Sequence, residues 1–197
     1  MNTLRKAGKN KLPGRPIRSK ILRRSRLLEM LRGNLDRKLT IICADAGYGK
    51  TTLLTQFCQE LKSPFVLCTL DAADSDVRSF FNRLISGMRK HAPSFGAKVK
   101  AVIAEKRSNE TVAGTFINEF IECIREEFFL IFDDYHRLRD GREIAGVVNY
   151  ILRHLPANLH VVIASRTTPP LYLSYYLAKQ ELLHLDKEHL QFDVAET

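Results

Sequence analysis

The chain has 197 residues, of which 45% are apolar and 27% charged, so it is long enough to fill one core, and we expect one main domain. No apolar stretch approaches the roughly 18 residues of a membrane span, and no apolar segment follows the basic N-terminus to form a signal peptide. Length, composition and a net charge of +9 therefore argue against a membrane or a secreted protein and predict a cytoplasmic one.

The positive charge is concentrated at the N-terminus. Residues 1–26 hold 10 Lys or Arg and no acid, which leaves 21 bases against 22 acids in the remainder. Because Pro13, Gly14 and Pro16 interrupt any regular structure, we expect an extended basic arm over residues 1–20 and the folded domain over residues 21–197. Such an arm can bind nucleic acid or can be a solvated tail beside a partner, and both interpretations stay open.

Neither the cysteines nor the histidines are spaced as metal ligands. The four cysteines are scattered without a C-x-x-C motif in apolar neighbourhoods, so we expect reduced thiols in the core. The six histidines are expected to be satisfied or exposed imidazoles. We therefore predict no structural metal.

Helices and strands are expected to alternate along the chain. Hydrophobic periodicity predicts helices over residues 20–32, from 50 onward, from about 76, over 112–124 and over 144–155. Apolar runs predict strands over residues 39–44, 65–70, 128–132, 159–164 and 182–185. Either Asp74 or Ser75 is the expected N-cap of the third helix, whereas residues 91–108 are polar and irregular and are assigned to no element.

This alternation predicts the fold class. Near-continuous apolar strands separated by helices are typical of a parallel sheet that is covered on both faces. The expected architecture is α/β, a three-layer sandwich around a parallel five-stranded sheet, as in P-loop NTPases.

The segment between the first strand and the second helix has the pattern of a phosphate-binding loop, or Walker A motif. Gly47 and Gly49 allow backbone N–H groups to turn toward an anion, and the following helix adds the positive end of its dipole. The usual pattern G-x-x-x-x-G-K-[ST] starts with glycine, whereas this chain has Ala44 there, so only the second half of the pattern matches.

Several residues of this loop are candidate nucleotide ligands. Lys50 is expected to reach the β- and γ-phosphate oxygens, Thr51 to bind Mg²⁺, and Thr52 to donate to the α-phosphate. The candidate nucleotide-binding residues of the loop are Ala46, Gly47, Tyr48, Gly49, Lys50, Thr51 and Thr52.

Two carboxylates follow the apolar strand over residues 128–132, which is the pattern of a Walker B motif. Acidic side chains at a buried strand end are unfavourable unless a cation or a water uses them. Asp133 is expected to hold Mg²⁺ through one of its waters, and Asp134 to orient or deprotonate the water that attacks the γ-phosphate. Because parallel strands end at a common edge, we expect the loop strand and the Asp133 strand to lie side by side.

Arg166 follows the strand over residues 159–164 and is expected at the same edge of the sheet. Its guanidinium group suits a phosphate and would sense whether the γ-phosphate is present, although a surface arginine at a strand end is the alternative. The predicted catalytic residues are therefore Lys50, Asp134 and Arg166.

These residues together resemble the nucleotide-binding domain of the STAND signalling ATPases, and most closely that of the MalT-like regulators, the large ATP-binding members of the LuxR group of transcription factors. The resemblance covers nearly the whole chain. It is carried by Lys11-Leu12, Arg24-Ser25-Arg26-Leu27-Leu28, Ala46-Gly47-Tyr48-Gly49-Lys50-Thr51-Thr52, Leu70-Asp71 with Asp74 and Asp76, Phe132-Asp133-Asp134-Tyr135-His136, Ala164-Ser165-Arg166 and Pro169-Pro170-Leu171.

The resemblance implies an ASCE-type P-loop fold in which the strand ending at Ala164 lies between the loop strand and the Asp133 strand, and it places Arg24 beside the adenine. It also implies a switch that binds ATP or ADP with Mg²⁺, hydrolyses ATP slowly, self-associates in the ATP state and regulates transcription in response to a signal. DNA would be bound only through other domains, because the winged helix, the helical-repeat sensor and the helix-turn-helix of the family are absent from this chain, which looks like an excised or naturally short module.

One residue of the loop departs from the resemblance. Asp45 stands where such regulators commonly carry proline. A carboxylate beside the phosphates is expected to weaken nucleotide affinity or to shift the preference toward ADP.

Other functional classes are weighed against this one. A small-molecule kinase fits the length and the loop, but the sequence shows no arginine-rich lid segment at the expected place. A GTPase is disfavoured because no Asn-Lys-x-Asp segment for guanine occurs. A nucleic-acid-binding module built on residues 1–26 would show salt-sensitive affinity. If the chain is an enzyme, we expect a weak ATPase.

Overall fold

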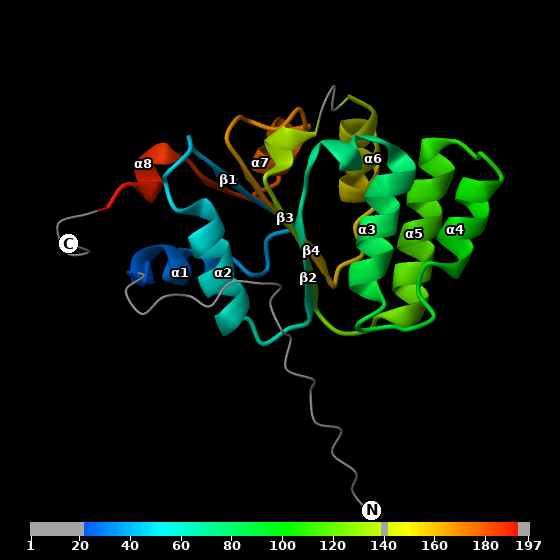
Figure 1. Ribbon diagram of the computed structural model, residues 1–197. Coiled ribbons are helices and arrows are strands. Elements are labelled where there is room, and N and C mark those ends of the chain that lie inside the picture. The colour runs from blue at the N-terminus through cyan, green and yellow to red at the C-terminus, as the bar shows by residue number, and fades with distance from the viewer. Residues whose placement is uncertain (1–21, 139–141, 193–197) are drawn as a thin grey trace, which may run out of the picture.

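The computed structural model describes residues 22–138 and 142–192, and the expected basic arm over residues 1–20 lies outside them. The described chain forms a five-stranded sheet in the order β2-β3-β4-β1-β5, with all neighbouring strands parallel. Helices cover both faces of this sheet (Figure 1), so the predicted α/β three-layer sandwich is confirmed.

The strands form where the sequence has its apolar runs. They are β1 Leu39–Cys43, β2 Phe65–Thr69, β3 Phe128–Asp133, β4 Leu159–Ser165 and β5 Leu182–Leu185. Every residue of β3 and β4 is buried, because these central strands are covered on both faces. The edge strands β2 and β5 are buried only in part.

The helices divide between the two faces of the sheet (Figure 1). One face is covered by α1 Ser25–Arg32, α2 Lys50–Glu60 and α8 Lys187–Leu190. The other is covered by α3 Val77–Met88, α5 Asn109–Cys123 and α6 Arg142–Arg153, with α4 Ala97–Ala104 packed on the outer side of α5. Short elements complete the chain, namely the 3-10 helices η1 Ala72–Ser75 and η2 Tyr135–Arg137 and the helix α7 Leu173–Ala178.

The pleat of the strands decides which side chains meet which layer of helices. On β3, the first, third and fifth residues pack with α3, α5 and α6, whereas Phe129 and Ile131 pack with α1 and α2. Asp133 continues this second series. Its carboxylate therefore lies on the α2 face of the sheet, where the helix that follows the glycine-rich loop begins.

The first helix starts at Ser25, not at residue 20 as predicted. Leu27, Leu28 and Leu31 form its buried face, as the periodicity indicated. Before it, the N–H group of Arg24 donates to the side chain of Gln56 at 3.1 Å, so the backbone is turned toward α2. This contact ends the helix on its N-terminal side.

Residues 91–108 contain α4, which the sequence did not predict. Only Val99 of this helix is fully buried, so its apolar pattern is weak. The helix is held by Glu119 of α5, which is 3% exposed and accepts from the N–H groups of Ala97 at 3.0 Å and Val99 at 3.3 Å. A carboxylate there satisfies N–H groups that the first turn leaves unpaired.

The N-cap of α3 is Asp76, so the prediction of Asp74 or Ser75 was wrong. The carboxylate of Asp76 accepts from the N–H group of Ser79 at 3.0 Å. Asp74 lies in η1 instead, where its carboxylate accepts from the N–H group of Asp71 at 2.9 Å. The short helix η1 takes up the residues that the sequence assigned to the cap.

The cysteines are less uniformly buried than predicted. Cys58 and Cys68 are buried, and burial raises the pKa of both thiols to about 12, but Cys43 is half-buried. Cys123 is exposed because it is the last residue of α5, so the expected core position was wrong for this residue. Among the described residues, no three metal-ligating side chains cluster, and no helix is long and apolar enough to cross a membrane.

Gly87 marks a close approach between α3 and β2. A Cβ atom at Gly87 would lie 2.3 Å from Cγ1 of Val66. Gly87→Ala is therefore expected to lower the free energy of unfolding by about 1–3 kcal/mol, although alanine gains roughly 1 kcal/mol in helix propensity. Gly146 of α6 is the matched control, since a Cβ there would meet no described atom within 4 Å, and Gly146→Ala should stabilise by up to about 1 kcal/mol. Urea unfolding measures both, and stabilisation by both substitutions would contradict this packing.

Candidate nucleotide-binding site

The loop between β1 and α2 has the backbone geometry of an anion cradle. Gly47 and Gly49 adopt left-handed conformations with φ of 89° and 75°, which residues with side chains rarely adopt. Gly49 is also the N-cap of α2, and within the described chain no side chain caps this helix end. The first N–H groups of α2 are therefore positioned to donate to an anion.

Lys50 is folded back over this loop. It is 8% exposed, and its ammonium group donates to the carbonyl oxygens of Ala44 at 2.6 Å and Asp45 at 2.8 Å. Burial, and next the charge of Arg166, lower the pKa of Lys50 below its ordinary value of 10.5. Carbonyl groups offer dipoles without an opposite charge, so a phosphate oxygen is a stronger partner for this ammonium.

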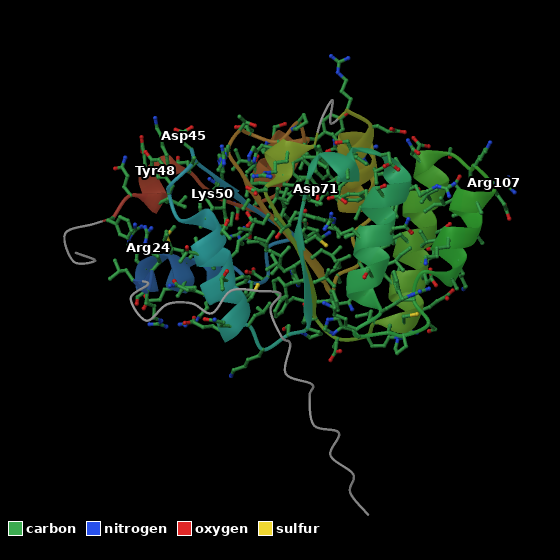
Figure 2. The ribbon with its side chains drawn as sticks, in the orientation of Figure 1. Arg24, Asp45, Tyr48, Lys50, Asp71 and Arg107 are labelled. Atoms are coloured by element: carbon green, nitrogen blue, oxygen red, sulfur yellow. The ribbon has the colours of Figure 1, made fainter. Side chains whose placement is uncertain are left out.

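Two residues of the loop, Ala44 and Asp45, differ from the usual pattern, and they differ in burial. Ala44 is 5% exposed, so a small methyl group fills the buried place where the pattern has glycine. Asp45 is exposed, and Figure 2 shows it with Tyr48 and Lys50 around the loop at the N-terminal end of α2. The effect of the Asp45 carboxylate on nucleotide affinity stays a prediction.

A hydrogen bond joins the loop helix to the acidic strand end. The hydroxyl group of Thr51 donates to Oδ2 of Asp133 at 2.8 Å. Asp133 is 3% exposed, and this burial raises the pKa of its carboxyl group above the ordinary 3.8. Its Oδ1 atom accepts from the N–H group of Asp134 at 2.9 Å. A hydroxyl and a buried carboxylate side by side are a donor set that fits Mg²⁺.

The loop strand and the Asp133 strand are not neighbours, because β4 lies between β1 and β3. The predicted adjacency was wrong, and the order implied by the family resemblance is confirmed. The contact between Thr51 and Asp133 forms because α2 packs across the sheet onto β3, where Phe57 meets Phe129 edge to face at 6.1 Å.

Asp134 lies at the rim of this site. It has a left-handed backbone with φ of 58°, and its carboxylate pairs with Nε of Arg137 at 3.2 Å. Nδ1 of His136 lies 4.0 Å from the same carboxylate. The sequence interpretation missed Arg137, although its spacing of three residues from Asp134 was a usable signal. The role of Asp134 in orienting water stays a prediction.

Arg166 reaches the site from β4. Its residue is exposed, and after burial its charge is the next cause that lowers the pKa of Lys50. Burial also lowers the pKa of His136, and the charge of Arg166 contributes to that shift. Because β4 lies between β1 and β3, its carboxyl end brings Arg166 between the loop and the acidic pair. The contact with a γ-phosphate stays a prediction.

Arg24 borders the loop from the α1 side (Figure 2). It is 3% exposed, and its Nη1 atom lies 3.9 Å from the position of a Cβ atom on Gly49. Its Nη2 atom donates to the carbonyl oxygen of Leu190 at 2.7 Å. Thr52, the candidate α-phosphate donor, is half-buried in the first turn of α2.

Arg26 belongs to the segment that carries the family resemblance, but the sequence interpretation gave it no contacts. Its Nη2 atom donates to the carbonyl oxygens of His189 at 2.7 Å and Gln191 at 3.2 Å. Its partners are backbone atoms far along the chain, and no local pattern identifies such partners.

One protein family and several known proteins match the part of the chain that contains the loop and the acidic pair. The profile of the family described as AAA domain matches residues 33–173. The HTH-type transcriptional regulator MalT of Vibrio parahaemolyticus is 32% identical over 176 residues, 88% of this chain and 19% of the relative. MalT of Yersinia enterocolitica is 32% identical over 182 residues, 91% of this chain and 20% of the relative. The chain thus spans about a fifth of the length of these relatives.

Solved structures resemble it in fold. A Walker-type ATPase of Pyrococcus abyssi superposes with a TM-score of 0.56 at 18% identity, over 91% of this chain and 56% of that chain. A structure of Drosophila ORC bound to AT-rich DNA and Cdc6 gives a TM-score of 0.53 at 13% identity, over 82% of this chain and 55% of that chain. Together with the family profile, these similarities confirm the predicted P-loop fold.

Proposed function

The chain belongs to the AAA domain family, and from this premise we propose that it is a nucleotide-dependent switch domain that binds ATP or ADP with Mg²⁺ and hydrolyses ATP slowly. The observation that supports this most directly is the 2.8 Å hydrogen bond between Thr51 and Asp133. This bond places a hydroxyl group and a buried carboxylate beside an uncapped helix end, and that combination suits a phosphate-bound cation.

Binding follows from the groups around the loop. The N–H groups of residues 46–52 hold the phosphates, and Lys50 exchanges the carbonyl oxygens of Ala44 and Asp45 for phosphate oxygens. Thr51 and Asp133 hold the cation, which when bound neutralises charge on the β- and γ-phosphate oxygens. Arg24 lies beside the same loop and borders the bound nucleotide on the α1 side.

Hydrolysis is expected to be slow because the residue proposed to orient the water is already engaged. The carboxylate of Asp134 is paired with Nε of Arg137 at 3.2 Å, so one of its two oxygens is engaged and only the other is left to orient a water molecule. Arg166 contributes positive charge toward the γ-phosphate from the end of β4. Nucleotide exchange and hydrolysis would then alternate two states of a switch.

The biological setting is proposed from the relatives. They are named as HTH-type transcriptional regulators, and the chain matches about a fifth of their length. We place the domain within a signal-responsive regulator of that kind in the cytoplasm, which self-associates in the ATP state. DNA would be bound by other domains of that regulator and not by the residues of this chain.

Mass spectrometry of the nucleotide released from the purified protein tests the proposal. ADP or ATP is the expected species, and incubation with ATP and Mg²⁺ should release free phosphate slowly. A bound guanine nucleotide would contradict the adenine assignment. Transfer of phosphate to a small acceptor would support the kinase alternative instead.

A further inference from the structure

Arg24 lies close to two parts of the molecule that are far apart in sequence. On one side, its Nη1 atom lies 3.9 Å from the Cβ position of Gly49, the residue that starts α2 at the phosphate-binding loop. On the other side, its Nη2 atom donates to the carbonyl oxygens of Leu190 at 2.7 Å and Gln191 at 3.3 Å. One buried guanidinium group thus lies between the loop and the last described residues of the chain.

These last residues, 186–192, comprise α8 with its N-cap and the residues after it, and we call them the exit segment. Asp186 caps α8 by accepting from the N–H groups of Glu188 at 2.9 Å and His189 at 3.1 Å. Leu190 is 1% exposed and packs in the core on the α2 face. Phe192 is 55% exposed, and the centroid of its ring lies 4.1 Å from Cζ of Arg24. Leu190 therefore anchors the exit segment in the core, and Arg24 holds the backbone around it.

We propose that Arg24 couples nucleotide binding at the loop to the order of the exit segment, so that each stabilises the other. The inference rests on the proposed function, because it requires a phosphate-bearing ligand at Gly47 to Thr52. It adds to that function a way in which nucleotide binding at the loop changes the order of the exit segment.

The geometry sets the sign of this coupling. The nitrogen that faces Gly49 and the nitrogen that donates to the carbonyl groups are different atoms of one planar guanidinium group. A phosphate at the loop would therefore approach a nitrogen of Arg24 other than the one that holds the carbonyl groups. Binding of the nucleotide then favours the orientation that holds Leu190 and Gln191, and an ordered exit segment in turn holds Arg24 against the loop. Because coupling free energy is reciprocal, both effects have the same size.

The effect of nucleotide on the exit segment is measured by amide hydrogen exchange of the whole chain, with and without saturating ADP and Mg²⁺. The N–H groups of Leu190 and Gln191 donate within the exit segment, to Asp186 and Lys187, so their exchange reports its order. We expect ADP to slow their exchange about fivefold or more, the lower end of typical coupling. If calorimetry shows that ADP binds and this exchange is unchanged, the inference is overturned while the proposed function stands. If ADP and ATP do not bind at all, the proposed function itself fails.

Arg24→Lys tests the residue. Lysine keeps the charge but has one nitrogen, so it cannot serve both sides, and we expect about tenfold weaker ADP binding and no slowing of exchange at saturation. Arg23→Lys is the matched control, because Arg23 pairs with Glu60 at 2.8 Å and should leave both properties unchanged. Thermal unfolding without nucleotide verifies that both variants fold. Wild-type coupling in Arg24→Lys contradicts the proposal.

Asp186 tests the exit segment without touching a buried group. Asp186→Ala removes the cap of α8 and should weaken ADP binding severalfold, whereas Asp186→Asn keeps a cap and should not. A purely electrostatic role would give the opposite sign for both substitutions, because removing a negative charge strengthens the binding of an anionic nucleotide. In the double variant with Arg24→Lys, the loss is expected to be smaller than the sum of the two single losses. Additive losses would show that the two residues act separately and would overturn the coupling.

Discussion

Replacing Lys50 with alanine is expected to reduce the affinity for ATP and ADP by about 100-fold or more. Lys50 is 8% exposed, and its ammonium group is held at the loop by the carbonyl oxygens of Ala44 and Asp45 at 2.6 and 2.8 Å. Two unit charges about 4 Å apart attract by about 4 kcal/mol at an effective dielectric constant of 20. About 2.8 kcal/mol already corresponds to a 100-fold change in dissociation constant. Calorimetry with ADP and ATP measures the loss.

Lys62→Ala is the matched control for this prediction. Lys62 is an exposed lysine just beyond the C-terminal end of α2, so its removal changes the net charge equally and leaves the loop intact. Its nucleotide affinity should stay close to that of the wild type. Because Lys50 also ties down the loop, the thermal unfolding of Lys50→Ala without nucleotide must be measured as well. A folded Lys50→Ala protein that binds ATP normally would refute the phosphate-binding assignment.

The sequence was sufficient to predict the strands, because burial on both faces leaves a direct trace in residue type. β3 and β4 are buried at every position, and both were predicted as apolar runs with an error of one residue at the carboxyl end. Their order in the sheet was a different problem. An apolar run indicates that a strand is central but not which strand lies beside it, so the adjacency expected for β1 and β3 was wrong. The correct place of β4 came from the family resemblance alone.

Two of the mispredictions about helices, the missed α4 and the start of α1, depend on contacts between distant residues. The N-terminus of α4 is held by Glu119 of α5, and the backbone before α1 is held by Gln56 of α2. Neither contact changes the local hydrophobic pattern. The N-cap of α3 was mispredicted for a local reason, because Asp74, Ser75 and Asp76 could each serve as the cap, and η1 takes up the first two.

The candidate site shows the same division. Gly47, Gly49, Lys50 and Thr51 are contiguous, so their spacing alone predicted their place at one loop. Thr51 and Asp133 were both predicted at the magnesium site, but the reason given, adjacent strands, was wrong because β4 lies between β1 and β3. The attachment of Arg24 to the exit segment could not be anticipated, because its acceptors are backbone carbonyl groups, which every residue carries. Its proposed role consequently rests on the structure and not on a motif.

Asp133→Asn is expected to impair Mg²⁺-dependent nucleotide binding. The side chain keeps its size and an oxygen acceptor for the hydroxyl group of Thr51 or the N–H group of Asp134, which now lie at 2.8 and 2.9 Å. The charge is lost, so the cation loses an anionic partner. We expect the gain in ATP affinity that Mg²⁺ provides to fall by about 10- to 100-fold, the usual effect of removing a residue that supports a metal from its outer shell. Titrations with ATP in Mg²⁺ and in EDTA measure that gain.

The same substitution should leave the unfolding midpoint without nucleotide equal to or above that of the wild type at neutral pH. Asp133 is 3% exposed, and burial raises the pKa of its carboxyl group, so the ionised form destabilises the protein unless a cation is present. Asp76→Asn is the control, because an asparagine also caps α3 and lies outside the site. An acid that served only the fold would behave in the opposite way, with a lower unfolding midpoint and an unchanged response to Mg²⁺. Lost Mg²⁺ dependence together with retained stability therefore distinguishes a cation site from a structural carboxylate.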